Sequence, residues 1–236
     1  MIEKKPLTAV GSTSTERERR DAFGAVFAAS PIPMDERLAN LGLYMKRQDL
    51  SRLLFIHEIY QKVVDVHGVV MEFGVRWGQN LALFTALRGI YEPYNFNRKL
   101  IGFDTFEGFP GVSPEDGKGD FIKEGAYGVG DDYEAHLRAV LEFHEAECPI
   151  AHKTKFELVR GDASQTVPEY LVKHPETIVA LAYFDFDLYA PTRACLEALQ
   201  PHLTKGSVLV FDELNVSDRA STPSPRHSGQ VANLSR

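Results

Sequence analysis

The stretch Val69-Val-Met-Glu72-Phe-Gly74-Val-Arg-Trp-Gly78-Gln-Asn80 places a short apolar run directly before a turn that contains two glycines. After this turn, apolar residues recur at helical spacing up to residue 91. A strand, a glycine-rich turn and a helix in this order are typical of open α/β sheets. Glycines in such a turn let backbone amides approach a ligand closely at the start of the helix.

Four further apolar runs follow, and each ends in an acidic residue or a glycine. The runs cover residues 99–104, 156–162, 178–185 and 207–212, and helical patterns cover 78–91, 131–146, 165–173 and 191–203. Continuous apolar runs that alternate with helices indicate strands buried on both faces, and therefore a parallel sheet. We predict an α/β fold of the Rossmann-like type, a doubly wound and mostly parallel sheet with helices on both faces.

Composition limits the classes of protein and partner. The chain has 236 residues, of which 44% are apolar, and its 26 basic and 33 acidic residues give a net charge of −7. This composition is that of a globular protein, and the acidic balance argues against nucleic-acid or membrane-surface binding. Cys148 and Cys195 lack metal or disulfide spacing, and no signal peptide or membrane-length apolar run is present. We therefore expect a cytoplasmic protein with two buried thiols.

Three segments do not follow the strand–helix rhythm. Residues 1–67 are predicted to be a polar segment, without regular structure over 1–20, followed by a helical cover, and the main domain is predicted to span 68–215. Residues 107–130 contain seven glycines, which is typical of a lid or binding loop. Residues 216–236 are rich in Ser, Pro and Arg and are predicted to be a disordered tail.

Carboxylates stand at the end of each predicted strand. They are Glu72, Asp104, Asp162, Asp185, Asp187, Asp212 and Glu213. One such residue often caps the next helix. Acids at five strand ends in register would repel one another, so together they indicate a cation or a hydroxyl-rich ligand.

Two sets of motifs resemble known families. The turn E-x-G-x-x-x-G over residues 72–78 resembles the first motif of class I S-adenosylmethionine-dependent methyltransferases, whereas the dinucleotide fingerprint would need a glycine in place of Glu72. The segments Asp104-Thr-Phe-Glu-Gly108-Phe-Pro, Phe184-Asp-Phe-Asp187-Leu-Tyr and Phe211-Asp-Glu213 resemble the macrocin O-methyltransferase family over about residues 46–215. Members of this family methylate sugar hydroxyls of natural products.

The resemblance implies a set of site residues. Those for S-adenosylmethionine, which is released as S-adenosylhomocysteine, are Glu72, Gly74, Arg76, Gly78, Asn80, Asp104, Thr105, Phe106, Gly108, Asp162, Ala163 and Asp185. Asp104 would accept from the ribose hydroxyls and Asp162 from the adenine amino group. Asp185, Asp212 and Glu213 would hold Mg²⁺, although the family commonly has Asp in place of Glu213. Asp187 would be the general base.

The chemistry of methyl transfer to an alcohol agrees with this assignment. A divalent cation can bind two vicinal hydroxyls and lower the pKa of one, and a carboxylate then takes the proton. Two residues apart on a strand, Asp185 and Asp187 would face the same side about 6.5–7 Å apart, which suits one ligand and one base. We predict a magnesium-dependent O-methyltransferase, a homo-oligomer, acting on a deoxysugar hydroxyl of a nucleotide-sugar or glycosylated secondary metabolite.

Three alternatives remain open. A catechol or phenol O-methyltransferase would use the same metal chemistry, and an NAD-dependent oxidoreductase would need the dinucleotide turn that the sequence lacks. A truncated, non-catalytic S-adenosylmethionine-binding protein is the third alternative. Residues 216–236 show neither strand alternation nor a helical stripe, whereas related methyltransferases have a helix and a terminal hairpin there. We therefore expect the C-terminal hairpin to be missing or altered.

Overall fold

The computed structural model describes residues 13–109, 111, 125, 127–130, 132–186, 188–212 and 230–233. Contacts divide the chain into unit 1, Met1–Arg52 with Ser217–Arg226, and unit 2, Leu53–Val216 with His227–Arg236. Helix α3 (Arg47–Val63) begins in unit 1, and from Leu53 onward it belongs to unit 2, whereas the main domain is predicted from the sequence to start at residue 68. None of the described helices has the length and apolar character needed to cross a membrane.

Unit 2 is built on a six-stranded sheet of order β3-β2-β1-β4-β5-β6. The strands are β1 (Val69–Phe73), β2 (Leu100–Asp104), β3 (Phe156–Arg160), β4 (Val179–Phe184), β5 (Leu203–Phe211) and β6 (Gln230–Asn233). The first five are parallel, and β6 is antiparallel to β5. The chain runs from β1 outward to β3 and returns to β4 on the other side of β1, so the strand order reverses between β1 and β4.

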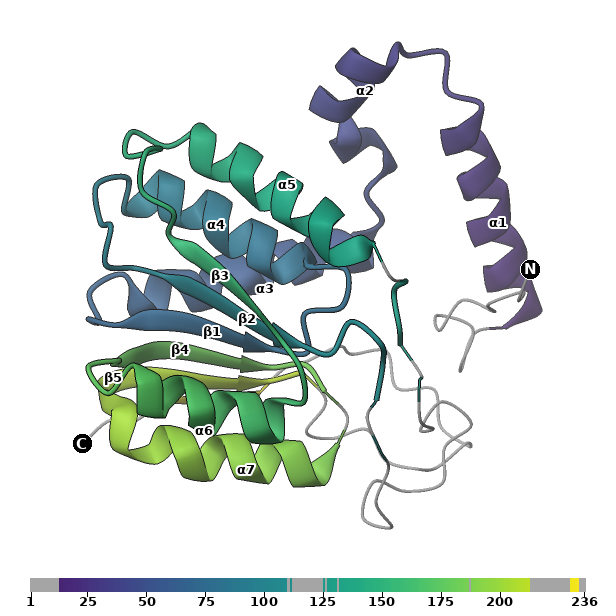
Figure 1. The fold of residues 1–236 in the computed structure, drawn as a ribbon. Helices are drawn as coiled ribbons and strands as arrows, with labels where there is room; N and C mark the ends of the chain where they lie inside the picture. Colours follow the sequence, from purple (N-terminus) through teal and green to yellow (C-terminus); the bar gives the residue numbers. More distant parts are fainter. Residues whose placement is uncertain are drawn as a thin grey trace. The chain divides into compact units, whose positions relative to one another are not determined.

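Helices cover both faces of the sheet (Figure 1). One core cluster joins α3, α4 (Gln79–Tyr91) and α5 (Tyr133–Ala146) to one face, and a second joins α6 (Ala163–Lys173) and α7 (Tyr189–Leu199) to the other. Within β1, Val70 belongs to the first cluster and its neighbour Met71 to the second, as expected for side chains that alternate across a strand buried on both faces. The predicted doubly wound α/β fold is confirmed.

Both cysteines are buried, as the sequence predicts. Cys195 lies within the core between α6 and α7, and burial raises the pKa of its thiol to about 12. A thiol with this pKa is protonated and unreactive at neutral pH.

The prediction that residues 1–20 lack regular structure is wrong from residue 14 onward. Helix α1 (Ser14–Ala28) begins there, and Thr13 and Glu16 form a capping box. The Glu16 amide donates to Thr13 Oγ1 at 3.2 Å, and the Thr13 amide donates to Glu16 Oε2 at 2.9 Å. None of the residues of α1 is buried, and residues 14–21 are all polar, so the first half of the helix lacks the apolar stripe from which helices are predicted. Unit 1 also contains α2 (Met34–Ala39) and the 3₁₀ helix η2 (Leu41–Tyr44).

The segment 216–236 lies outside the described residues except for β6. Strand β6 pairs with β5 in the register Phe211↔Gln230 to Val208↔Asn233. This strand differs from the disordered tail that the sequence predicts, and it extends the sheet beyond β5. Of the predicted lid, residues 107–109, 111, 125 and 127–130 are described.

A buried ionic cluster links α4, α5 and the start of β3. Arg88 and Lys155 both pair with the Glu145 carboxylate, the latter at 2.6 Å, and all three side chains are at most 6% exposed. Lys155 Nζ also donates to the carbonyl oxygens of Ile150 and Lys153 at 2.8 and 2.7 Å. The cluster thus ties two helices to the loop that leads into β3.

Candidate functional site

The strand order reverses at the carboxyl ends of β1 and β4, which is where open α/β sheets bind their ligands. The β1–α4 turn, the residues after β2 and the acids after β4 and β5 all lie at this edge of the sheet. The predicted residues whose placement the structure describes are Glu72, Gly74, Arg76, Gly78, Asn80, Asp104, Thr105, Phe106, Gly108, Asp162, Ala163, Asp185 and Asp212. Asp187 and Glu213 lie outside the described residues.

The β1–α4 turn requires glycine at two positions. Gly74 has φ +87°, and a Cβ there would lie 2.4 Å from the carbonyl oxygen of Asp185. Gly78 is the N-cap of α4 with φ +74°, and a Cβ there would lie 2.3 Å from a methyl carbon of Leu137. No side chain among the described residues caps α4, so its first amides face the site.

Glu72, Asn80 and Asp185 form a polar cluster between β1, α4 and β4. Asn80 Nδ2 donates to Glu72 Oε1 at 3.0 Å and to Asp185 Oδ2 at 3.4 Å. Glu72 and Asn80 are almost fully buried. The amide group of Asn80 thus bridges two carboxylates that would otherwise repel each other. It fixes both at the edge of the sheet where the strand order reverses between β1 and β4.

Asp104 at the end of β2 accepts hydrogen bonds from the backbone of two segments. Its Oδ2 accepts from the amide of Arg76 at 2.7 Å, and its Oδ1 accepts from the amide of Phe106 at 2.5 Å. Burial raises the pKa of this carboxyl, while the backbone donors and the Arg76 charge act in the opposite direction. A carboxylate has about four lone-pair sites, so it can accept from ribose hydroxyls in addition to these backbone amides.

Two residues that contact Asp104 have strained backbones. Arg76 has φ +49° and Phe106 φ +58°, a region that side-chain-bearing residues rarely adopt. Their amides point at Asp104 because of this conformation. Such strain is typical of ligand-binding turns.

The C-terminal end of the glycine-rich segment 107–130 lies beside the site. The amide of Val129 donates to the carbonyl oxygen of Phe106 at 3.2 Å, and a Cβ on Gly128 would lie 2.8 Å from the carbonyl oxygen of Glu107. The Arg76 guanidinium lies over the ring of Tyr127 at 5.0 Å. Both described ends of segment 107–130 therefore meet beside the β1–α4 turn, where a binding loop would act.

Thr105 and Gly108 close the turn after β2. Thr105 Oγ1 donates to the Gly108 carbonyl oxygen at 2.6 Å and accepts from the Glu107 amide at 3.2 Å. The hydroxyl is therefore engaged within the turn. Direct cofactor contacts of these two residues stay a prediction.

Asp162 has the capping role that strand-end acids often have. It is the N-cap of α6, and its Oδ1 accepts from the Ser164 amide at 2.9 Å. Its neighbour Ala163 is buried in the second core cluster. Contacts of Asp162 and Ala163 with the cofactor stay predictions beside these structural roles.

Asp185 and Asp212 follow residues that are register partners on β4 and β5, Phe184 and Phe211. Asp212 Oδ1 accepts from the Tyr183 hydroxyl at 2.8 Å. The two carboxylates thus stand at adjacent strand ends and supply oxygen donors of the kind that Mg²⁺ takes. Among the described His, Cys, Asp and Glu side chains, no group of three could hold a metal ion.

Tyr183 and Tyr127 are not among the site residues predicted from the sequence. Tyr183 is fully buried, and it is the only residue of β4 whose side chain carries a polar atom. Because a buried hydroxyl needs a hydrogen-bond partner, this polar atom in an apolar run was the signal in the sequence that could have identified Tyr183. Tyr127 lies in a segment without periodicity, so only the fold brings it to Arg76.

Replacing Gly74 by alanine is expected to weaken the binding of S-adenosylhomocysteine at least about 10-fold and to destabilise unit 2 by about 1–3 kcal/mol. The reason is the clash with the Asp185 carbonyl oxygen together with the positive φ. Calorimetry and urea denaturation measure the two effects. Gly24→Ala is the control, because a Cβ there meets nothing within 4 Å. Unchanged affinity in Gly74→Ala would contradict this role of the turn.

Comparisons with known proteins agree with this geometry. The methyltransferase domain family matches residues 71–214. The chain is similar to the crystal structure of CalS11, a calicheamicin methyltransferase, with 46% identity, 93% of this chain and 85% of that chain covered, and a TM-score of 0.84. An apo structure of CalS11, described as TDP-rhamnose 3'-O-methyltransferase of calicheamicin biosynthesis, shares 43% identity over 89% of this chain and 84% of that chain, with a TM-score of 0.75.

Two other comparisons carry less weight. The O-methyltransferase NovP has 22% identity over 68% of this chain and 64% of that chain, with a TM-score of 0.52, and this likeness supports the fold alone. The comparison with curated proteins gives no match.

Proposed function

The chain belongs to the methyltransferase domain family and is an S-adenosylmethionine-dependent O-methyltransferase, and from this premise we propose that it methylates a deoxysugar hydroxyl in secondary-metabolite biosynthesis. The observation that carries the proposal is the 46% identity over 93% of the chain to CalS11. The second CalS11 structure is described as a TDP-rhamnose 3'-O-methyltransferase, which makes a nucleotide-linked 6-deoxyhexose the first acceptor to test. The homo-oligomeric state and the cytoplasmic location stay predictions.

The β1–α4 turn and the end of β2 would bind the cofactor. S-adenosylmethionine supplies a methyl group on a sulfonium sulfur, and S-adenosylhomocysteine is the by-product. The first amides of α4 and the backbone at Gly74 would bind the polar end of S-adenosylmethionine, because both lie at the edge of the sheet where the strand order reverses. Asp104 would accept from the ribose hydroxyls in addition to the backbone amides that it already binds.

The acids after β4 and β5 would activate the acceptor. Asp185, Asp212 and Glu213 would hold Mg²⁺, which lowers the pKa of a bound hydroxyl. The adjacent strand ends of Asp185 and Asp212 support this assignment. Asp187 would take the proton of the reacting hydroxyl as general base.

Removal of divalent cations is expected to lower the methylation rate about 100-fold or more, because the acceptor hydroxyl then keeps its ordinary pKa. The initial rate is measured with EDTA and again after Mg²⁺ is added in excess. EDTA already saturated with Mg²⁺ is the control and should leave the rate unchanged. A chelated enzyme that works at full rate would contradict the metal assignment.

A panel of acceptors tests the substrate class. Methyl transfer from labelled S-adenosylmethionine is compared for TDP-rhamnose, other TDP-deoxysugars, a rhamnosylated aromatic glycoside and catechol. We expect the highest kcat/KM for a deoxysugar and no transfer to catechol. Transfer to catechol with none to any sugar would instead show the phenol-type enzyme, and no transfer to any acceptor would favour the non-catalytic protein.

A further inference from the structure

The guanidinium of Arg76 lies against two aromatic rings beside the β1–α4 turn. Its central carbon is 5.0 Å from the centre of the Tyr127 ring and 5.7 Å from the centre of the Trp77 ring. Both distances are within the range of cation–π contacts. The Trp77 ring itself packs edge-on against Tyr133 at 4.8 Å. The Arg76 side chain is thus held by rings from two segments, the β1–α4 turn and the C-terminal end of segment 107–130.

Tyr127 is fixed in place within its own segment. Its φ is +68°, in the left-handed region that side-chain-bearing residues rarely adopt. Its ring lies 5.1 Å from that of Phe109, and the amide of Gly125 donates to the carbonyl oxygen of Phe109 at 3.0 Å. A strained backbone persists where the surrounding contacts determine it, and such residues cluster at sites that clamp a ligand. The contact with Arg76 is therefore the feature that the position of Tyr127 serves.

The charge of Arg76 belongs to a turn that is suited to an anion. Helix α4 begins after Gly78, and no described side chain caps its first amides. Within the described part of the chain, no hydrogen-bond acceptor reaches the buried Nε atom of Arg76. Buried donors are nearly always paired, so this atom indicates an acceptor supplied by a ligand. S-adenosylmethionine has one anionic group, the carboxylate of its methionine part, and arginine binds carboxylates through charge-assisted hydrogen bonds.

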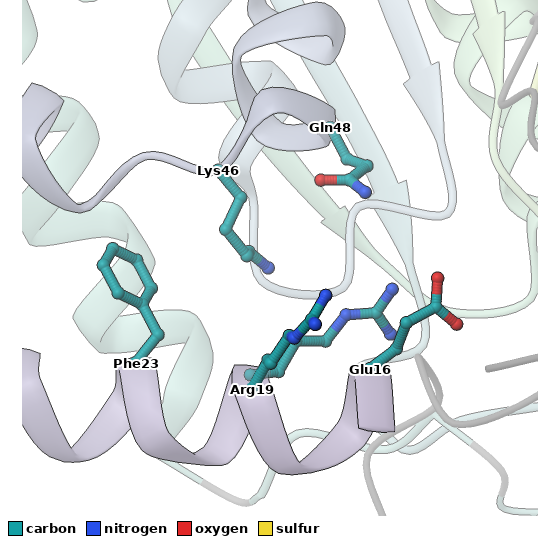
Figure 2. A pocket seen from close by; sticks show the side chains of 6 residues that line it. Glu16, Arg19, Phe23, Lys46 and Gln48 are labelled. Carbon is teal, nitrogen blue, oxygen red and sulfur yellow. The ribbon is translucent and has the colours of Figure 1, made fainter. Parts of the chain in front are cut away.

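A pocket in unit 1 also places arginine near an aromatic ring. Figure 2 shows Arg19 and Phe23 on α1 and Lys46 on the segment before α3. All residues that line this pocket belong to unit 1, whereas Arg76 and Tyr127 belong to unit 2 with the β1–α4 turn. The arginine–aromatic contact that bears on the cofactor is therefore the one between Arg76 and Tyr127.

We propose that Tyr127 is a positioning residue for cofactor binding. Its ring holds the Arg76 guanidinium at the β1–α4 turn, where the guanidinium binds the carboxylate of the methionine part of S-adenosylmethionine. The inference rests on the cofactor that the proposed function uses, and it deepens that function, because it makes cofactor affinity depend on segment 107–130. The nucleoside part of the cofactor needs neither Arg76 nor Tyr127.

The test is the variant Tyr127→Leu in the full chain, studied by calorimetry with two ligands. We expect S-adenosylhomocysteine to bind about 3- to 30-fold more weakly than to the wild type, because one cation–π contact is lost. 5′-Methylthioadenosine has the nucleoside and the sulfur but no carboxylate. Its affinity should therefore stay within about 2-fold of the wild type.

Three further variants separate the ring from other effects. Tyr127→Phe keeps the ring and should bind S-adenosylhomocysteine as the wild type does. Arg76→Gln removes the charge, and Tyr127→Leu added to it should weaken binding no further, because no cation is left for the ring to hold. Tyr94→Leu is the matched control, since Tyr94 is 73% exposed and lies beyond the C-terminal end of α4.

Three results would overturn the proposal. They are equal affinity of the wild type and Tyr127→Leu for S-adenosylhomocysteine, a loss in Tyr127→Leu that is the same for both ligands, and a loss in Tyr127→Phe as large as in Tyr127→Leu. The second result would show that Tyr127 serves the fold and not Arg76. If the cofactor assignment itself fails, the wild type binds neither ligand, whereas a failure of the positioning role alone leaves binding by the wild type intact.

Discussion

Replacing Glu145 by alanine is expected to lower the free energy of unfolding by about 3–5 kcal/mol. Glu145 is the shared partner of Arg88 and Lys155, and all three side chains lie almost entirely out of water. Without the carboxylate, two cations remain buried between α4, α5 and the start of β3. Lys155 keeps its two carbonyl acceptors, but neutral oxygens do not balance its charge.

Urea denaturation followed by circular dichroism measures this loss. Glu142→Ala is the matched control on the same helix, and it should change the free energy by less than about 0.5 kcal/mol because Glu142 is exposed. Glu145→Gln separates charge from hydrogen bonding, since the amide oxygen still accepts one bond while the charge is gone. An alanine variant as stable as the control would show that the cluster does not hold α5 against α4.

Replacing Asp187 by asparagine is expected to lower kcat about 10²- to 10⁴-fold, the range for loss of a general base. The amide cannot take the proton of the acceptor hydroxyl, but it has nearly the same size. The affinity for S-adenosylhomocysteine should therefore stay unchanged.

Asp65→Asn is the control for this substitution, because Asp65 is exposed and lies outside the site. Steady-state kinetics with TDP-rhamnose gives kcat and KM of each variant. An Asp187→Asn enzyme with the wild-type kcat would exclude Asp187 as the general base.

The sheet could be predicted from the sequence because each strand is a continuous apolar run bounded by polar residues. For β4, the expected run 178–185 corresponds to the strand Val179–Phe184, since all six of its residues are buried. Burial on both faces leaves a clear pattern in the amino acids. The same pattern shows where each strand ends. Because the carboxyl ends of parallel strands lie at one edge of the sheet, it predicted that Glu72 and Asp185 lie at the same edge.

Helix α1 and the partner of Asp212 could not be found in this way. Helix α1 buries no side chain and its residues 14–21 are all polar, so the marker of its start is the local Thr13–Glu16 capping box. Tyr183 contacts a residue 29 positions further along the chain, a pairing that depends on the β4–β5 register. Local patterns report burial and capping, whereas contacts across strands follow from topology.

Asp104 shows how far a predicted role can be refined. The sequence predicts an acid at the end of β2 that faces a ligand. The structure adds that this acid fixes the amide of Arg76, 28 positions earlier in the chain, and so joins the two turns of the site. The positive φ of Arg76, which directs its amide at Asp104, is not encoded in composition or periodicity.

The most direct test of the central claim is the identification of the reaction product. The chain is incubated with S-adenosylmethionine carrying a ¹³C-labelled methyl group, with TDP-rhamnose and with Mg²⁺, and the product is examined by NMR and mass spectrometry. We predict a ¹³C-methyl ether on one hydroxyl of the deoxysugar and one S-adenosylhomocysteine for each methylated sugar. Unmodified TDP-rhamnose after prolonged incubation, with the label transferred to catechol or to no acceptor, would contradict the account.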